Sequence, residues 1–247
     1  MPVHHIVQLT DFHIQADAHA TALGLQPFST LKRTLAQTQQ HPCDAYFFTG
    51  DLSEDGSQAA YQHIIEATQT ISRPIYYVPG NHDCPAVMHQ TFANSPLQRT
   101  SVVELDPWQI ILLDSNLPGH IEGRLDHDQL QSLTQLLNRQ KPTLIFVHHN
   151  IAEPEELGKL PSMFANTDDL VSTLQPFHAH VKAIVCGHVH AAYDFDYQGF
   201  RLLSTPSTCY QFAIEQGQVI QTDAAPGYRS FQLFDDGQFT TQIHCLT

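Results

Sequence analysis

Short runs of apolar residues alternate with longer amphipathic stretches up to about residue 187, and this alternation limits the fold more than any other feature. The apolar runs predict buried strands at residues 6–10, 45–49, 75–78, 102–105, 110–114, 143–147 and 183–186. The stretches between them predict helices at residues 29–40, 58–71, 85–93, 126–138 and 167–174, the fourth with Asp126 as its N-cap. Strands that alternate with helices in this way predict an α/β fold.

After Gly187 the chain changes to short runs in which apolar and polar residues alternate. These runs predict antiparallel strands at residues 193–197, 200–204, 228–234 and 239–244, with a tight turn at Asp236 and Gly237. We find no internal repeat, low-complexity tract or linker in the sequence. We therefore expect one domain over residues 1–247, with an antiparallel region at about 191–247.

Several of the predicted strands end in side chains that can bind a metal ion. These side chains are Asp11, His13, Asp51, Asn81, His82, Asp83, His148, His149, His188 and His190. Ligand sites in α/β folds form at the carboxyl ends of the strands, so we expect these residues to lie together.

Glycines and a two-residue spacing accompany these side chains. Gly50, Gly80 and Gly187 stand at the ends of three apolar runs, where a glycine allows a sharp turn. Asp11 and His13 are two residues apart, as are His188 and His190, and we expect each pair to lie on one side of an extended segment.

Two carboxylates, one amide and four imidazoles suit a pair of divalent or trivalent ions. Imidazole suits Zn and Fe, and carboxylate or carbonyl oxygen also accepts Mn. Two such ions about 3.5–4 Å apart can clamp a phosphate, and Asp51, central in the series, is the natural bridge between them. Taken singly, Asp11 and Asp51 could be caps or turn residues and Asn81 an Asx turn, but the ordered series favours the metal site.

The charge of the chain disfavours a nucleic-acid partner. Lys and Arg total 11 against 25 Asp and Glu, which gives a net charge of −14 with His neutral. A surface of this charge repels polyphosphate. An anionic substrate would therefore need a local positive group, and a bound metal is the obvious candidate.

The cysteines and the length of the apolar runs bear on the cellular compartment of the protein. The five cysteines are scattered, with no Cys-x-x-Cys pair, which argues against a disulfide framework and a thiolate zinc site. No apolar run approaches the roughly 20 residues that span a bilayer, and the first residues do not resemble a signal peptide. We expect a cytoplasmic protein with no membrane partner, either a monomer or a dimer.

The ordered series of motifs resembles the calcineurin-like metallophosphoesterases. It comprises Asp11-x-His13, Gly50-Asp51-x-x-x-Asp55, Gly80-Asn81-His82-Asp83, His148-His149 and Gly187-His188-x-His190. The tail is similar to the bacterial class III 3′,5′-cyclic AMP phosphodiesterases. That second resemblance lies in Thr205-Pro206-Ser207-Thr208-Cys209-x-Gln211-Phe212, Ala225-Pro226-Gly227-Tyr228-Arg229 and Asp236-Gly237-x-x-x-Thr241.

The resemblance implies a four-layer αββα sandwich with two mixed β-sheets and two metal ions, with Fe and Mn favoured over Zn or other divalent ions. The implied ligands of the first ion are Asp11, His13, Asp51 and His190. The implied ligands of the second ion are Asp51, Asn81, His148 and His188. His82 would lie near the scissile phosphate, with Asp83 as the residue that orients it. Substrate contacts would come from Asn81, His82 and His149, although we favour His149 as a residue that holds a ligand.

The implied activity is hydrolysis of 3′,5′-cyclic AMP to 5′-AMP by attack of a metal-bridging hydroxide, with His82 assisting the departing 3′-oxygen. One alternative keeps the site but takes another substrate: a linear phosphodiester, a phosphomonoester, a dinucleotide or a phosphoprotein. Another alternative is a non-catalytic scaffold, which the intact Asn81-His82-Asp83 block disfavours.

A few further residues stand near these motifs. Asn150 follows His149 where many relatives have Pro or His, which predicts a different pocket rim. We assign no ligand role to Glu54 or Asp55 and no chemical role to Cys209, and we expect Cys84 to be a small buried filler. Arg124 and Arg229 could contact phosphate, but we expect them on solvated faces.

Overall fold

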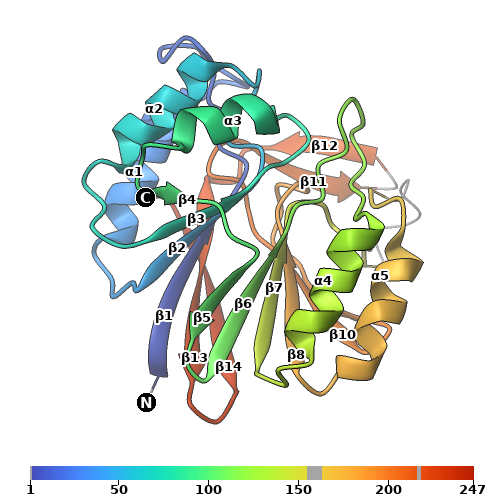
Figure 1. The fold of residues 1–247 in the computed structure, drawn as a ribbon. Coiled ribbons are helices and arrows are strands. Elements are labelled where there is room, and N and C mark those ends of the chain that lie inside the picture. Colours follow the sequence, from blue (N-terminus) through green and yellow to red (C-terminus); the bar gives the residue numbers. More distant parts are fainter. Residues whose placement is uncertain (1, 155–162, 216–217) are drawn as a thin grey trace.

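Two six-stranded sheets pack face to face, and helices cover the outer face of each (Figure 1). The computed structural model describes residues 2–154, 163–215 and 218–247. The layers follow the order helices, sheet, sheet, helices, so the expected four-layer αββα sandwich is confirmed.

The first sheet has the strand order β14-β13-β1-β2-β3-β4. Its strands are β1 (Pro2–Leu9), β2 (Ala45–Thr49), β3 (Ile75–Val78), β4 (Leu97–Gln98), β13 (Gly227–Phe234) and β14 (Phe239–Cys245). The strands β1 to β4 pair in parallel, whereas β13 pairs antiparallel with both β1 and β14. The sheet is therefore mixed, and its last two strands come from the predicted antiparallel region.

The second sheet has the strand order β5-β6-β7-β8-β10-β9. Its strands are β5 (Val102–Leu105), β6 (Trp108–Leu113), β7 (Thr143–Val147), β8 (Val181–Cys186), β9 (Asp194–Tyr197) and β10 (Phe200–Ser204). The four central strands are parallel, and each edge strand pairs antiparallel with its neighbour. Both sheets are mixed, as expected.

The helices divide between the two outer faces (Figure 1). The first sheet is covered by α1 (Pro27–Thr38), α2 (Gln58–Thr68) and α3 (Pro85–Phe92), and the second by α4 (His127–Leu137), α5 (Thr167–Leu174) and the 3-10 turn η2 (Gln175–Phe177). Asp126 caps α4 by accepting the backbone N–H of Gln129 at 2.8 Å, which confirms the predicted cap. Ser57 caps α2 in the same way.

The alternation of side chains along the strands gives the molecule three apolar layers. Ile6 and Phe47 point between the sheets, where they pack in a core that also holds Trp108. Val7 and Phe48, one position further along, pack under α1 to α3. A separate core lies between the second sheet and α4 with α5. Since the inter-sheet core joins the two sheets, their strand ends meet at one edge.

One hairpin was not expected from the sequence. The strands β11 (Gln211–Glu215) and β12 (Gln218–Thr222) pair antiparallel with each other and form a separate two-stranded sheet. In Figure 1 this hairpin lies at the end of the molecule where β7 and β8 finish.

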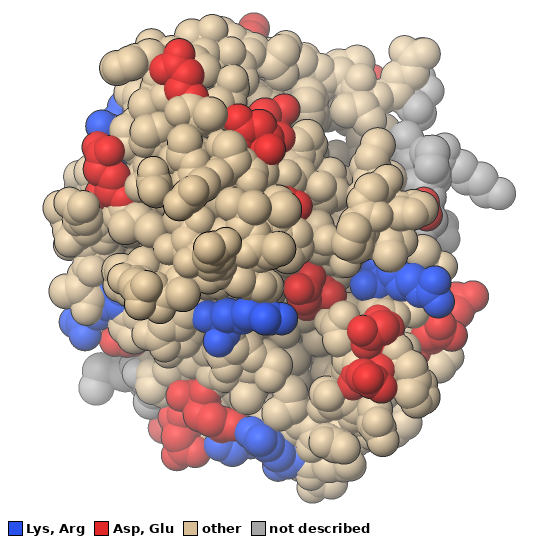
Figure 2. All heavy atoms as spheres, turned by 45° about the horizontal axis from the view of Figure 1, so that its top comes forward, with Lys and Arg blue, Asp and Glu red and all other residues tan. Residues whose placement is uncertain are grey.

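The described surface carries no large field of positive charge on the face shown in Figure 2. The Lys and Arg side chains on this face are few and are interspersed with acidic and neutral residues. Within the described ranges, no helix combines the length and the apolar character needed to cross a membrane.

Candidate metal centre

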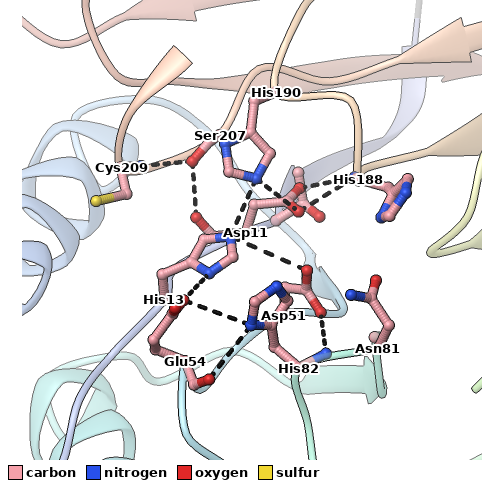
Figure 3. Close-up of polar contacts among 12 residues, drawn as sticks. Asp11, His13, Asp51, Glu54, Asn81, His82, His188, His190, Ser207 and Cys209 are labelled. Carbon is pink, nitrogen blue, oxygen red and sulfur yellow. Dashed lines mark hydrogen bonds and ion pairs between the residues drawn. The ribbon is translucent and has the colours of Figure 1, made fainter. Parts of the chain in front are cut away.

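The predicted donor residues come together where the two sheets meet (Figure 3). Asp11, Asp51 and Asn81 follow β1, β2 and β3 of the first sheet. His148 follows β7 of the second sheet, and His188 and His190 follow β8. Each sheet therefore contributes part of the donor set, from the carboxyl ends of its parallel strands.

Unusual backbone angles mark this cluster. Asp11, His13, Asp51, His188 and His190 have φ values of 56°, 51°, 49°, 67° and 50°. Residues other than glycine rarely adopt such angles, and those that do often lie at functional sites. The expectation that Asp11 with His13, and His188 with His190, each lie on one side of an extended segment is wrong, because both residues of each pair have left-handed backbone angles.

Glycines beside the cluster act in two different ways. Gly50 has a φ of +90°, which glycine adopts without strain, so the predicted sharp turn is confirmed there. Gly80 has no positive φ, but an added Cβ would clash with the Asp51 carboxylate and lie 2.7 Å from Nε2 of His148. Gly80 is needed because the ligand loops approach its backbone closely.

The first donor set is formed by Asp11, His13 and His190, which are buried. The Nδ1 of His190 lies 2.8 Å from the Tyr210 carbonyl oxygen, and the Nδ1 of His13 lies 2.6 Å from Oε2 of Glu54. Because both partners are acceptors, each Nδ1 carries the hydrogen and each Nε2 of a neutral ring carries a lone pair. These two Nε2 atoms face each other at 3.0 Å, an arrangement that a cation between them would stabilise.

The second donor set is formed by Asn81, His148 and His188. In this set, His148 is held through Nδ1 in the same way as His13 and His190. The Nδ1 of His148 donates to the Thr49 carbonyl at 2.8 Å, which leaves Nε2 facing Oδ2 of Asp51 at 3.3 Å and Oδ1 of Asn81 at 3.2 Å. Burial would lower the pKa of His148, but the charge of Asp51 raises it to about 9. The surroundings of this nitrogen therefore favour a positive charge.

His188 lies on the open side of the second set. Its backbone N–H donates to both carboxylate oxygens of Asp11, at 3.1 and 3.0 Å. Burial, followed by the neighbouring His148, lowers the pKa of its imidazole to about 4, so the ring remains a neutral donor. A neutral imidazole is the form that binds metal ions.

Asp51 stands between the two donor sets. It clusters with His13 and His82 on one side and with Asp11 and His148 on the other. Burial opposes its ionisation, but the neighbouring histidines, His148 foremost, hold the pKa of its carboxyl well below the usual range. The bare imidazole nitrogens and ionised carboxylates of both sets fit divalent transition metals.

The expected contact between Asp83 and His82 is wrong. Asp83 is buried and accepts hydrogen bonds from the backbone N–H groups of Leu52, Ser53 and Gly80 at 3.2, 2.9 and 2.9 Å. It also accepts from the hydroxyl of Tyr61. Its backbone partners lie on the two loops that carry Asp51 and Asn81, so Asp83 holds these loops together.

His82 is held by Glu54, a residue to which we assigned no ligand role from the sequence. The Nδ1 of His82 lies 3.3 Å from the backbone carbonyl oxygen and 3.6 Å from the carboxylate of Glu54. The same carboxylate accepts from His13, so Glu54 joins a donor residue to His82 (Figure 3). The sequence shows Glu54 beside Asp55, but nothing in the sequence indicates that two imidazoles contact the Glu54 carboxylate.

His149 is fully buried, and one of its ring nitrogens lies within 4.8 Å of ring nitrogens of His148 and His188. Its Nδ1 lies 2.7 Å from the Ser115 hydroxyl, and its ring packs against those of His148 and His188 with centroids 4.8 and 5.0 Å away. This position suits a residue that supports ligands better than one that touches substrate.

Asn150 is also buried and donates to Glu153 at 2.7 Å, so it lies behind the pocket rim.

The tail motif that begins at Thr205 contacts the backbone of the donor residue Asp11. The hydroxyl of Ser207 donates to the Asp11 carbonyl at 2.7 Å and accepts from the backbone N–H of Cys209 at 2.8 Å (Figure 3).

Arg229 is buried and donates to the Ser204 carbonyl at 2.7 Å. The expectation of a solvated or phosphate-binding Arg229 is therefore wrong, whereas Arg124 is exposed as expected.

A cavity of about 480 Å³ opens over the donor atoms. Its lining includes most of the predicted site residues, namely His13, Asp51, Asn81, His82, His188 and His190. It also includes Tyr210 and Phe212, which the sequence did not identify as site residues. Tyr210 stacks on His13 with centroids 5.1 Å apart, and Phe212 stacks on His190 at 4.9 Å.

Comparison with known proteins agrees with this geometry. A model of the calcineurin-like phosphoesterase family matches residues 4–192. The 3′,5′-cyclic adenosine monophosphate phosphodiesterase CpdA of Escherichia coli K12 is 36% identical, over 98% of this chain and 89% of that protein. The CpdA of Haemophilus influenzae is 30% identical, over 98% of this chain and 90% of its own length.

The fold also resembles known structures. A dimetal phosphatase from Danio rerio superposes with a TM-score of 0.73 at 13% identity, over 100% of this chain and 98% of that chain. This likeness agrees with the observed layers and topology. The resemblance expected from the motifs is thus confirmed, and the chain belongs to the calcineurin-like phosphoesterase family.

Proposed function

We propose that the chain hydrolyses 3′,5′-cyclic AMP to 5′-AMP with the help of two metal ions. The observation that carries this proposal is the pair of adjoining donor sets that share Asp51 at the floor of one cavity. The names of the relatives that are 30–36% identical over nearly the whole chain support the choice of substrate.

The donor geometry supports the ligand sets expected above. Asp11, His13 and His190 would hold the first ion, Asn81, His148 and His188 the second, and Asp51 both. The mixture of imidazole and carboxylate supports iron and manganese, with zinc as the next candidate. When bound, the ions would neutralise the charge of a phosphodiester and act on it as Lewis acids.

His82 would assist the leaving group. It lines the cavity and its side chain is 38% exposed, so it can reach a substrate. Since Glu54 holds Nδ1, the other ring nitrogen, Nε2, is the one available to the departing 3′-oxygen. A proton or a strong hydrogen bond from Nε2 would stabilise that oxygen as its bond to phosphorus breaks. Asp83 would act indirectly, through the loops it joins.

The cysteines support a reducing compartment. All five are free, at Cys43, Cys84, Cys186, Cys209 and Cys245. Disulfides are rare in the cytosol, so free thiols agree with the cytoplasmic location that we propose. The substrate would then be a small cytoplasmic nucleotide.

An activity panel on reconstituted protein tests this function. Purified protein is depleted of metal and reloaded with Mn, Fe or Zn, and each form is assayed on cyclic nucleotides, linear diesters and monoesters. We expect cyclic AMP to be hydrolysed to 5′-AMP only by the reloaded forms. Turnover of a linear diester or a monoester at much higher kcat/KM than cyclic AMP would reject the proposed substrate.

A further inference from the structure

The cavity over the donor sets has two chemically different parts. Its floor carries the carboxylate, amide and imidazole groups already described, whereas its wall is largely apolar. The wall includes Ile121, Val189, Phe212, Ile214 and Val219. None of the described lining residues is Lys or Arg, so the wall offers no site for a second phosphate.

Three residues of the apolar wall share one face of the β11–β12 hairpin, whose fourth residue, Gln221, does not line the cavity. Phe212 and Ile214 are two residues apart on β11 and share a face, and Ile214 pairs directly with Val219 on β12. All three line the cavity, whereas Ala213 and its partner Ile220, on the other face, do not. The register of the hairpin therefore directs its apolar face toward the site.

Two of the residues that line the cavity are exposed apolar side chains. Ile121 and Val219 are 66% and 59% exposed, and they belong to the three described large apolar side chains that are exposed, the third being Leu23. That two of the three line one cavity, from separate elements, indicates a ligand with an apolar surface. Phe212 stacks on His190, which holds the wall at a fixed position beside the floor.

A ligand that fits both parts has an anionic group for the floor and a flat, weakly hydrated group for the wall. We propose that the cavity-facing side of the β11–β12 hairpin, together with Ile121, is the subsite for the nucleobase of the substrate. This inference rests on the proposed function and extends it, because it states which residues recognise the part of a nucleotide that does not react.

Two matched substrates test the subsite. One is cyclic AMP, and the other is methyl ribofuranoside 3′,5′-cyclic phosphate, which carries a methoxy group in place of adenine. The variant is Ile214→Thr with Val219→Thr, which keeps β-branched shapes suited to strands but makes the wall polar. The control is Ile220→Thr, the same change on the other face of the hairpin.

We expect the double variant to raise KM for cyclic AMP about tenfold with little change in kcat, because apolar contact with the base is lost. Turnover of the base-free substrate should be unchanged, and the control should behave as the unchanged protein on both substrates. Equal losses on both substrates, or no loss on either, would overturn the inference.

A binding measurement separates this inference from the proposed activity. Calorimetry compares 5′-AMP with ribose 5-phosphate, which lacks the base, on the unchanged protein and the double variant. We expect 5′-AMP to bind the unchanged protein about tenfold more tightly, and the double variant to remove that preference. Equal binding of the two ligands to the unchanged protein would overturn the subsite. Preference for 5′-AMP without hydrolysis of cyclic AMP would reject the proposed function and retain the subsite.

Discussion

At the scale of single residues, Asp51 offers a way to separate the folding of the site from its metal binding. Its φ of 49° is an angle that Asn tolerates better than most residues, so Asp51→Asn should fold. The amide oxygen can still accept the His82 backbone N–H that now bonds to the carboxylate at 2.9 Å. The change removes the negative charge shared by the two donor sets and replaces one carboxylate oxygen by an NH2 group.

We expect Asp51→Asn to bind fewer than two ions per chain and to lose at least about 100-fold in activity, since a neutral amide is a weaker ligand than a carboxylate. Metal analysis and kinetics on the same sample measure both effects. Asp55→Asn, the same change in the same loop, should keep both ions. Two ions per chain and near-normal turnover in Asp51→Asn would refute its bridging position.

His82→Ala should retain the metal ions but slow the reaction by an amount that depends on the leaving group. A ribose 3′-oxygen needs proton assistance, which is typically worth about 10²- to 10⁴-fold, whereas a nitrophenolate needs little. The variant should therefore lose far more activity on cyclic AMP than on bis-p-nitrophenyl phosphate. His120→Ala, at an exposed position, is the control. Equal losses on both substrates would instead assign His82 to phosphate positioning.

At the scale of elements, the loop after β3 must approach the loop after β2 closely. Gly80→Ala would place a methyl group against Asp51 and His148, so we expect reduced metal content with the secondary structure retained. Gly199→Ala is the matched control, since Gly199 has a φ of +87° in the turn between β9 and β10 and only His178 nearby. The control should lose about 1 kcal/mol of stability and keep its metal. Full metal content in Gly80→Ala would show that the loops can separate at no cost to binding.

The buried elements were predictable from sequence because burial leaves a strong pattern. The strands β2 and β7 are buried at every position, and their continuous apolar runs gave the observed bounds. The hairpin β11–β12 was missed because it pairs only with itself and is rich in glutamine, so no buried face enforces an apolar run. The order of strands within the sheets was not predicted, since it depends on pairs as distant in sequence as β1 and β13.

The donor residues were also predictable, and their supports were not. Each donor stands directly at a strand end, where chemistry and position can be read together. The partners of Asp83 are backbone N–H groups about 30 residues earlier, and any residue type supplies those. Likewise, the carbonyl oxygens of Thr49 and Tyr210 fix the imidazoles of His148 and His190, although their own side chains carry no sign of it.

At the scale of the whole molecule, we propose that the chain unfolds as one domain. The inter-sheet core contains strands of both sheets, so neither sheet keeps that core without the other. We expect one thermal transition, with the fluorescence of Trp108 and the far-ultraviolet circular dichroism changing together. Trp108 is the only tryptophan and is fully buried, so its signal reports on this core. Two separated transitions would contradict a single domain.

The charge of the molecule predicts that it does not bind duplex DNA at physiological salt. Its net charge is −14, and the face shown in Figure 2 has no continuous basic surface. Binding without sequence preference depends mainly on counterion release by Lys and Arg, which this chain has few groups to achieve. A gel shift at micromolar protein that weakens steeply with added salt would contradict this expectation.

The distance between the two sheets bears on the size of the ion that the donor sets can hold. Donors after β1, β2 and β3 belong to one sheet and those after β7 and β8 to the other, so the distance between them follows the separation of the sheets. Buried aromatic pairs such as Phe47 and Phe146, with ring centroids 4.9 Å apart, help to set that separation. Protein interiors are close-packed and compress little, so the gap cannot adjust freely to each ion. We therefore expect the apolar layer between the sheets, which contains no ligand, to limit the size of the ion that the donors can hold.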